Sequence, residues 1–407
     1  MAQRHLDPTD PMAGPAPTGD ALASYLRAQA MEFLRALRLH RENGSGANGA
    51  EGSVDAARAL RRSARRISAS LHTFQPLLDT DWCEGMRPEL AWVSGTLAME
   101  HAYTARLERL LSALHRLSGS TALPGPPAGA AAGARADGAA GKHADSAAGA
   151  RADVAAGARA DSAAGSRAAG AAPVPQKAAP RDAGLRNPPT PAQERGNLTV
   201  GAAKAGALLD RQLTLARTRA HSTALQALGS SRFHAIADKV AVLASEVPLN
   251  TSAATTDLRP LASAAQDRLT DAVTALPLVT AGHPYNAAAL VHGLSPDTVP
   301  HPQDAPWHQV RLLLRLHRYA REAVRGEPDG ACVVDLRLLS AGQALNRHRD
   351  ASEAAAAAAQ AARTPRIAPA TAYALGVLHA DQRHEVEAAR FAFQQAWQKE
   401  AEAVSTR

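Results

Sequence analysis

The stretch from Trp307 to Val324, WHQVRLLLRLHRYAREAV, repeats leucine and arginine at helical intervals. At about 100° of rotation per residue, Arg311, Arg315 and Arg318 fall within a sector of roughly 60°. Leu312, Leu313 and Leu316 point to the other side of the helix. The stretch therefore predicts an amphipathic helix with one cationic face.

The same spacing occurs far upstream, in SVDAARALRRSARRISASL at residues 53–71. Arg58, Arg62 and Arg65 again form a stripe, which Arg61 and Arg66 widen. A repeated arginine-bearing helix on either side of a long linker is typical of two related helical bundles. We therefore expect the two stripes to face each other.

The remaining segments follow the helical period, and no stretch alternates as a strand does. Aromatic residues make up only 3% of the chain, so the core is built from small and aliphatic side chains, which suits close-packed helices. Three helices are predicted before the linker, at 21–43, about 53–74 and 86–117, with Pro88 at an early position of the third. The predicted fold is all-α, with two pseudo-symmetric antiparallel bundles facing each other across a basic groove.

Composition divides the chain into four parts. Residues 120–197 are rich in Ala, Gly, Arg and Asp and then in Pro, and they contain almost no large apolar side chain. Such a segment cannot offset the entropy of ordering, so it is predicted to be a disordered linker. It separates a first helical half at 21–119 from a second at 198–407, and residues 1–20 are predicted to be a disordered tail.

The net charge is +7, and most of the positive charge is arginine. A guanidinium group binds phosphate in bidentate fashion, which favours a phosphate-rich partner, although a GC-rich genome also enriches arginine. The stripes have a second interpretation as solvated outer faces of surface helices. Against it, most of these arginines lack a carboxylate one turn earlier, so like charges stack along each helix. A long, repetitive polyanion would relieve that repulsion.

Several function classes lack the residues they need. No HExxH motif, nucleophile elbow or phosphate-binding glycine loop is present, so we expect neither an enzyme nor a cofactor nor a metal site. Cys83 and Cys332 have no metal-ligand spacing, which fits a reducing cytoplasm. No signal peptide and no membrane-spanning apolar run is found, so membrane association is not expected.

The two arginine helices resemble those of the CHAD family, the conserved histidine α-helical domain, whose halves each carry a helix of the form H-x-x-R-x-x-x-[RK]-R-x-R. The second-half copy is matched by His308, Arg311, Arg315, Arg318 and Tyr319, and the first-half copy by Arg58, Arg62 and Arg65. The stretches LNRHRD and AYALGVLHADQRHEVEAARFAFQQAW also look familial. The resemblance implies two pseudo-twofold bundles around a basic groove, binding of inorganic polyphosphate and association with polyphosphate granules, and it implies no catalysis.

The chain departs from the family pattern at several cationic positions. Asp55 stands where the first-half histidine belongs, and Ser63 replaces a basic residue. Leu312 and Leu316 replace two more in the second half, and His101 with Ala102 stands where Arg-Asp is usual. These departures reduce the positive charge of the expected site.

Candidate polyphosphate-binding residues come from both stripes. They are Arg58, Arg61, Arg62, Arg65, His308, Arg311, Arg315 and Arg318. RNA or DNA is the alternative partner, although the scattered aromatic residues offer no platform for stacking bases. An acidic protein is a third possible partner. The expected location is the cytoplasm, on polyphosphate granules if that is the ligand.

Overall fold

The structure is a computed structural model, and it confirms an all-α chain. It describes residues 18–43, 50–119, 191–278, 280–284, 286–294, 302–325 and 335–405. Within these ranges there is no extended strand, only one isolated antiparallel bridge between Leu78 and Leu249. The predicted tail up to residue 17 and the predicted linker from residue 120 to 190 lie outside the described residues.

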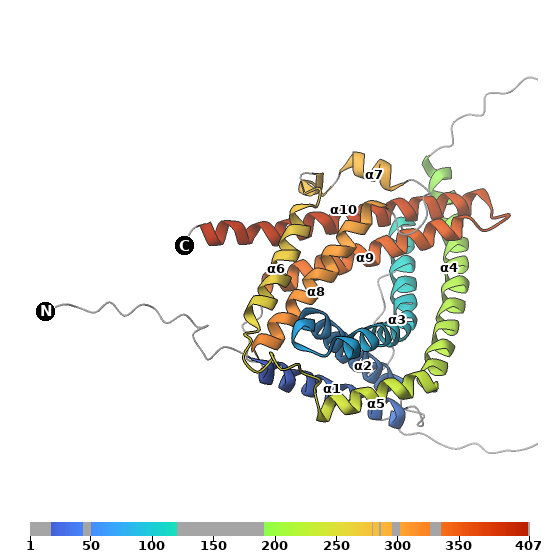
Figure 1. The fold of residues 1–407 in the computed structure, drawn as a ribbon. Coiled ribbons are helices and arrows are strands. Elements are labelled where there is room, and N and C mark those ends of the chain that lie inside the picture. Colours follow the sequence, from blue (N-terminus) through green and yellow to red (C-terminus); the bar gives the residue numbers. More distant parts are fainter. Residues whose placement is uncertain are drawn as a thin grey trace, which may run out of the picture. The chain divides into compact units, whose positions relative to one another are not determined.

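The helices follow one another along the chain as Figure 1 labels them. Their bounds are α1 Gly19–Asn43, α2 Ala50–Thr73, η1 Gln75–Leu77, α3 Thr80–Leu117, α4 Pro191–Leu228, α5 Ser231–Ser245, α6 Arg259–Thr274, η2 Thr280–Gly282, α7 Ala287–Gly293, η3 Pro302–Asp304, α8 Ala305–Arg325, α9 Leu336–Ala362 and α10 Pro369–Ser405.

Several helix starts differ from the sequence prediction, and α1 begins at Gly19, inside the residues predicted as a tail. Helix α3 begins at Thr80, and Pro88 lies inside it rather than in its first turn. The earlier start is stabilised by Asp79, whose side chain accepts a hydrogen bond from the Trp82 backbone N–H, a common N-cap. Helix α4 begins at Pro191, within the residues predicted as linker.

The first hydrophobic core contains residues from both halves of the chain. Phe33 of α1, Ile67 of α2 and Leu90 of α3 pack in the same cluster as Phe233 of α5. Ala320 of α8 belongs to it as well. The first three helices therefore complete their core with helices that follow residue 191.

Helices α9 and α10 form an antiparallel pair, which Figure 1 shows running side by side. The end of α9 packs against the start of α10 through residues such as Ala358 and Leu375, and the start of α9 packs near Phe393. Along α9 the buried side chains are mostly alanines, whose small size lets helix axes approach closely.

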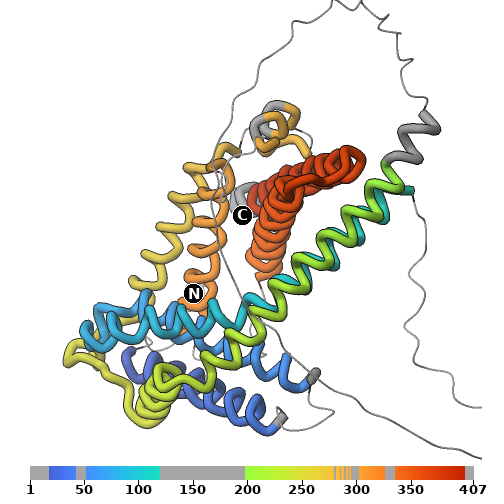
Figure 2. Tube along the Cα trace, turned by 90° about the vertical axis from the view of Figure 1, so that its right-hand side faces the viewer, coloured from blue at the N-terminus to red at the C-terminus, as the bar shows by residue number. Residues whose placement is uncertain are grey.

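The long helices α3 and α4 form a second pair, which Figure 2 shows as neighbouring tubes over much of their length. The C-terminal part of α3 and helix α4 share a core with the α9–α10 pair, through Leu114, Leu209 and Ala374. At Gly201 an added Cβ would lie 2.2 Å from the Ala370 carbonyl oxygen, so glycine permits the contact between α4 and α10. Across the described ranges, no helix combines the length and apolarity needed to cross a bilayer.

Candidate polyanion-binding site

Four arginines converge where α2 and α8 pack against each other. Arg61 and Arg65 come from α2, and Arg311 and Arg315 come from α8; we call these four the arginine cluster. Burial lowers the pKa of Arg65 to about 9, and the positive charges of Arg61, Arg315 and Arg311 add to the effect. Burial and neighbouring cations likewise lower the pKa of Arg311 to about 10. These two values stay above neutrality, so Arg65 and Arg311 are charged at pH 7.

The arginine cluster lacks the carboxylate partners that would neutralise it. Arg65 donates from Nε to Ser94 Oγ at 2.8 Å, and Arg311 donates from Nη1 to Asn346 Oδ1 at 3.4 Å. Among the described residues, no carboxylate lies within ion-pair distance of any of the four. Partly buried cations without counter-charges repel one another, and an external anion would stabilise them.

Further basic residues surround the cluster. Arg349 of α9 is among the cations that lower the pKa of Arg61, Arg311 and Arg315. Its guanidinium pairs with Asp350 at 2.5 Å, so it contributes less free positive charge. Arg349 lies in the LNRHRD stretch, but it was not predicted as part of the site, because nothing local in the sequence indicates that α9 lies beside α8.

Other candidates from the sequence lie at the margin of the cluster or away from it. Arg58 is exposed and pairs with Asp55 at 3.0 Å. Arg62 is exposed and lines a separate pocket beside α1, so it does not join the cluster. Arg318 is exposed and lies toward α9. If Gly342 of α9 carried a Cβ atom, that atom would lie 4.0 Å from Arg318 Nη1.

One ion pair holds the two cationic helices together beside the cluster. Arg66 of α2 pairs with Glu322 of α8 at 2.8 Å, and the Tyr25 hydroxyl of α1 donates to the same carboxylate at 3.3 Å. The Arg66 guanidinium also lies 5.7 Å from the Tyr319 ring centroid, within range of a cation–π contact. These contacts offset part of the repulsion between α2 and α8.

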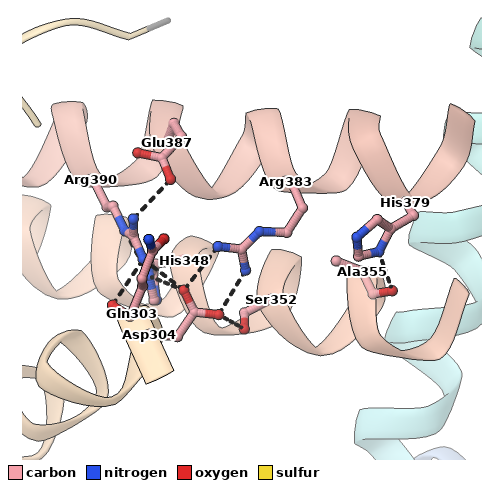
Figure 3. Close-up of polar contacts among 9 residues, drawn as sticks. All are labelled: Gln303, Asp304, His348, Ser352, Ala355, His379, Arg383, Glu387 and Arg390. Atoms are coloured by element: carbon pink, nitrogen blue, oxygen red, sulfur yellow. Dashed lines mark hydrogen bonds and ion pairs between the residues drawn. The ribbon is translucent and has the colours of Figure 1, made fainter. Parts of the chain in front are cut away.

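A buried polar network fixes the start of α8 against α9 and α10 (Figure 3). Asp304 of η3 is fully buried, and each of its carboxylate oxygens lies 2.7 Å from an arginine of α10, Arg383 or Arg390. Ser352 of α9 donates to the same carboxylate. Arg390 also pairs with the buried Glu387 at 2.8 Å.

The charges of this network balance. Burial by itself would raise the pKa of the Asp304 carboxyl, but its contacts with His348 and Arg383 outweigh burial and place that pKa well below the usual range. Burial lowers the pKa of His348 to about 4, so this imidazole is neutral at pH 7. Two carboxylates thus face two guanidinium groups. This network could not be predicted from local sequence patterns, because Asp304 and its arginine partners lie far apart along the chain.

His308 joins this network rather than the arginine cluster. Its ring contacts His348 edge-on, with centroids 5.5 Å apart. Burial lowers the pKa of His308, so it adds little positive charge at pH 7. Within the described residues, no group of three or more His, Cys, Asp or Glu side chains is arranged to hold a metal ion.

The chain is similar to a known protein family and to a solved structure. The family model of the CHAD domain matches residues 28–359, which is most of the chain. This chain belongs to the CHAD family. A solved structure, PptA from Streptomyces chartreusis, is 68% identical, with 94% of this chain and 100% of that chain covered and a TM-score of 0.67. No curated protein matches the chain. The CHAD resemblance predicted from the two arginine helices is therefore confirmed.

Proposed function

We propose that the protein binds inorganic polyphosphate through the arginine cluster. The observation that carries the proposal is the convergence of four arginines from two distant helices, with no carboxylate partner among the described residues. Each phosphate of a chain can accept charge-assisted hydrogen bonds from a guanidinium group, and neutralising several charges together releases counterions. Membership of the CHAD family supports the same ligand.

Membership of the CHAD family also supports a proposal for where the protein is found in the cell. We infer that the protein associates with polyphosphate granules, because a site for a long chain would hold the protein on its polymer. The proposed role is binding rather than catalysis. The cluster contains only permanently charged guanidinium groups, and these position and neutralise phosphates but do not exchange protons at neutral pH.

The test measures binding of long-chain polyphosphate to the wild-type protein and to Arg311→Gln, Arg315→Gln and the double variant. A charged hydrogen bond is worth about 1.5–3 kcal/mol, so each single change should weaken binding by at least about 10-fold and the double change more. Arg217 on α4 is exposed and serves as the control, since Arg217→Gln removes the same charge elsewhere. Equal losses of affinity in Arg217→Gln and Arg315→Gln would mean that polyphosphate responds to the net charge of the protein and not to the arginine cluster.

Salt and competitors separate the possible polyanions. If four charges are neutralised at about 0.7 counterions each, the logarithm of the binding constant should fall with a slope of about −3 against the logarithm of salt concentration. Orthophosphate should compete poorly because it reaches few arginines at once. Tighter binding of random RNA than of polyphosphate would favour the nucleic-acid alternative and contradict the proposal.

A further inference from the structure

One face of helix α9 leads from the arginine cluster to helix α3. Four polar residues share this face, because their helical spacing keeps them within a sector of about 100°. They are Asn346, Arg349, Asp350 and Glu353. Asn346 accepts a hydrogen bond from Arg311 of the cluster at 3.4 Å. Glu353 lies about two turns further along α9, which is about 10 Å along the helix axis.

Two arginines beside this face are held by carboxylates of α9. One oxygen of Glu353 lies 2.5 Å from Arg106 Nη2 of α3, and its other oxygen lies 3.7 Å from Arg349 Nε. Asp350 also pairs with Arg349, at 2.5 Å from Nη2. Glu353 therefore joins α3 to α9. It occupies guanidinium groups that a phosphate could otherwise contact.

The same charged groups act on the arginine cluster. Burial is the main cause that lowers the pKa of Arg311, and Arg315 and Arg349 add to it. Glu353 and Asp350 act on this pKa in the opposite direction. The side chain of Glu353 is 37% exposed and that of Asp350 is 46% exposed. A polyanion that extends from the cluster along α9 would therefore meet these two carboxylates.

We propose that Glu353 limits how far a bound polyphosphate chain extends along α9. The inference rests on the proposed function of the arginine cluster. In the wild-type protein the polymer contacts the cluster, and its path ends where Glu353 pairs with Arg106 and repels phosphate. Without this carboxylate the path continues to Arg106, because a guanidinium group released from an ion pair can bind a phosphate. Glu353 thus reduces the preference of the site for long chains over short ones.

The experiment compares the binding of long-chain polyphosphate and of tripolyphosphate to the full wild-type chain and to Glu353→Gln. The variant should bind the long chain about 5-fold more tightly, the factor expected for one partly exposed ion pair. Tripolyphosphate affinity should change less than about 2-fold, because three phosphates cannot occupy the cluster and reach Arg106, and the removed charge acts on them only through screened repulsion. For the long chain, the salt slope should become steeper by about 0.7, as expected for one more neutralised cation.

A second substitution shows whether the gain arises through Arg106. Arg106→Gln, added to Glu353→Gln, restores the wild-type net charge and should return the affinity to within about 2-fold of the wild-type value, because the released guanidinium is gone. Glu89→Gln is the matched control for net charge. Glu89 lies on α3 and pairs with Arg232 of α5 at 2.7 Å, so its removal releases an arginine that is not next to α9.

Three results would contradict the role of Glu353. They are an unchanged affinity for the long chain in Glu353→Gln, an equal gain in Glu89→Gln, and a gain that persists when Arg106 is also replaced. If Arg315→Gln weakens binding while Glu353→Gln leaves it unchanged, the proposed function stands and only this inference fails. Absence of polyphosphate binding to the wild-type protein would overturn both.

Asp350→Asn keeps the test decisive if Glu353→Gln proves unstable. Asp350 is the more exposed of the two carboxylates, and its loss removes one of the two partners of Arg349. This variant should also bind long-chain polyphosphate more tightly than the wild-type protein does. An unchanged or weaker affinity in a folded Asp350→Asn variant would count against a competing role for the carboxylates of α9.

Discussion

Neighbouring arginines on α2 have different surroundings. Arg61 is partly buried and lies among the cations of Arg315 and Arg349, whereas Arg62 is exposed beside α1. One residue turns the side chain by about 100°, which is enough to move it from the contact with α8 to another surface. Position around the helix therefore decides which charges can act on one ligand.

This difference predicts unequal effects of two similar substitutions. Arg61→Gln should weaken polyphosphate binding about 10-fold, because it removes a charge from the arginine cluster. Arg62→Gln should change affinity less than about 2-fold, because an exposed charge elsewhere contributes only through screened, long-range attraction. Titrations of both variants at one salt concentration check this. Equal losses would mean that the whole surface of α2 binds the polymer.

Helix α8 has two faces with different surroundings. One face carries Arg311 and Arg315, and another packs Leu314 into the core and carries the buried His317 beside it. The start of α8 is held by the Asp304 network, so the network positions the arginines that α8 contributes to the cluster.

Removing the Asp304 charge tests how strongly the network holds α8. Asp304→Asn keeps the size of the side chain but leaves Arg383 and Arg390 buried opposite a neutral amide. Breaking a buried pair in this way costs about 3–5 kcal/mol, and urea denaturation should show a loss of that size. The exposed pair of Asp55 and Arg58 provides the control, since Asp55→Asn should cost less than about 1 kcal/mol. Similar losses in the two variants would contradict the role of the network.

The buried His317 side chain should make the folded state sensitive to acid. Burial, together with the charge of Arg321, lowers the pKa of His317 to about 4, although Asp335 acts in the opposite direction. An unfolded histidine titrates near 6.5, so between about pH 6.5 and 4 the unfolded chain binds a proton that the folded chain does not. The free energy of unfolding should therefore decrease as the pH is lowered from about 6.5 to 4. His317 should account for on the order of 3 kcal/mol of this decrease.

The comparison with His317→Asn isolates this contribution. The variant should lose less stability than the wild-type protein between pH 6.5 and 4, as measured by chemical denaturation at several pH values. His348 is present in both proteins, so its own titration cancels in the difference. Parallel stability curves for the two proteins would rule out the assignment to His317.

At the scale of the whole molecule, the two helical halves form shared cores. One cluster joins α1, α2 and α3 to α5 and α8, and another joins α3 to α4, α9 and α10. Residues 18–119 therefore leave part of their apolar surface uncovered without the second half. The halves predicted from composition mark a division of the sequence, and we expect them to fold together.

Replacing residues 122–190 with a short Gly-Ser linker tests this organisation. The sequence of this segment offers almost no large apolar side chain to a core, so the free energy of unfolding and the polyphosphate affinity should stay close to the wild-type values. A shorter connection also costs slightly less loop-closure entropy. By contrast, residues 1–121 expressed alone should give no cooperative unfolding transition. Loss of binding after the replacement would assign a role to the linker.

The sequence by itself determined the all-α class, most helix positions and two cationic helices, because helical periodicity is a local property that side-chain spacing reveals. The sequence also indicated the family, through residues such as Arg311 and Arg315. Only the tertiary structure decided that Arg61 and Arg65 meet them, that Arg62 does not, and that Asp304 pairs with arginines of α10. Periodicity defines the face of a helix but not its neighbour, since the neighbour depends on how apolar surfaces from distant segments pack together.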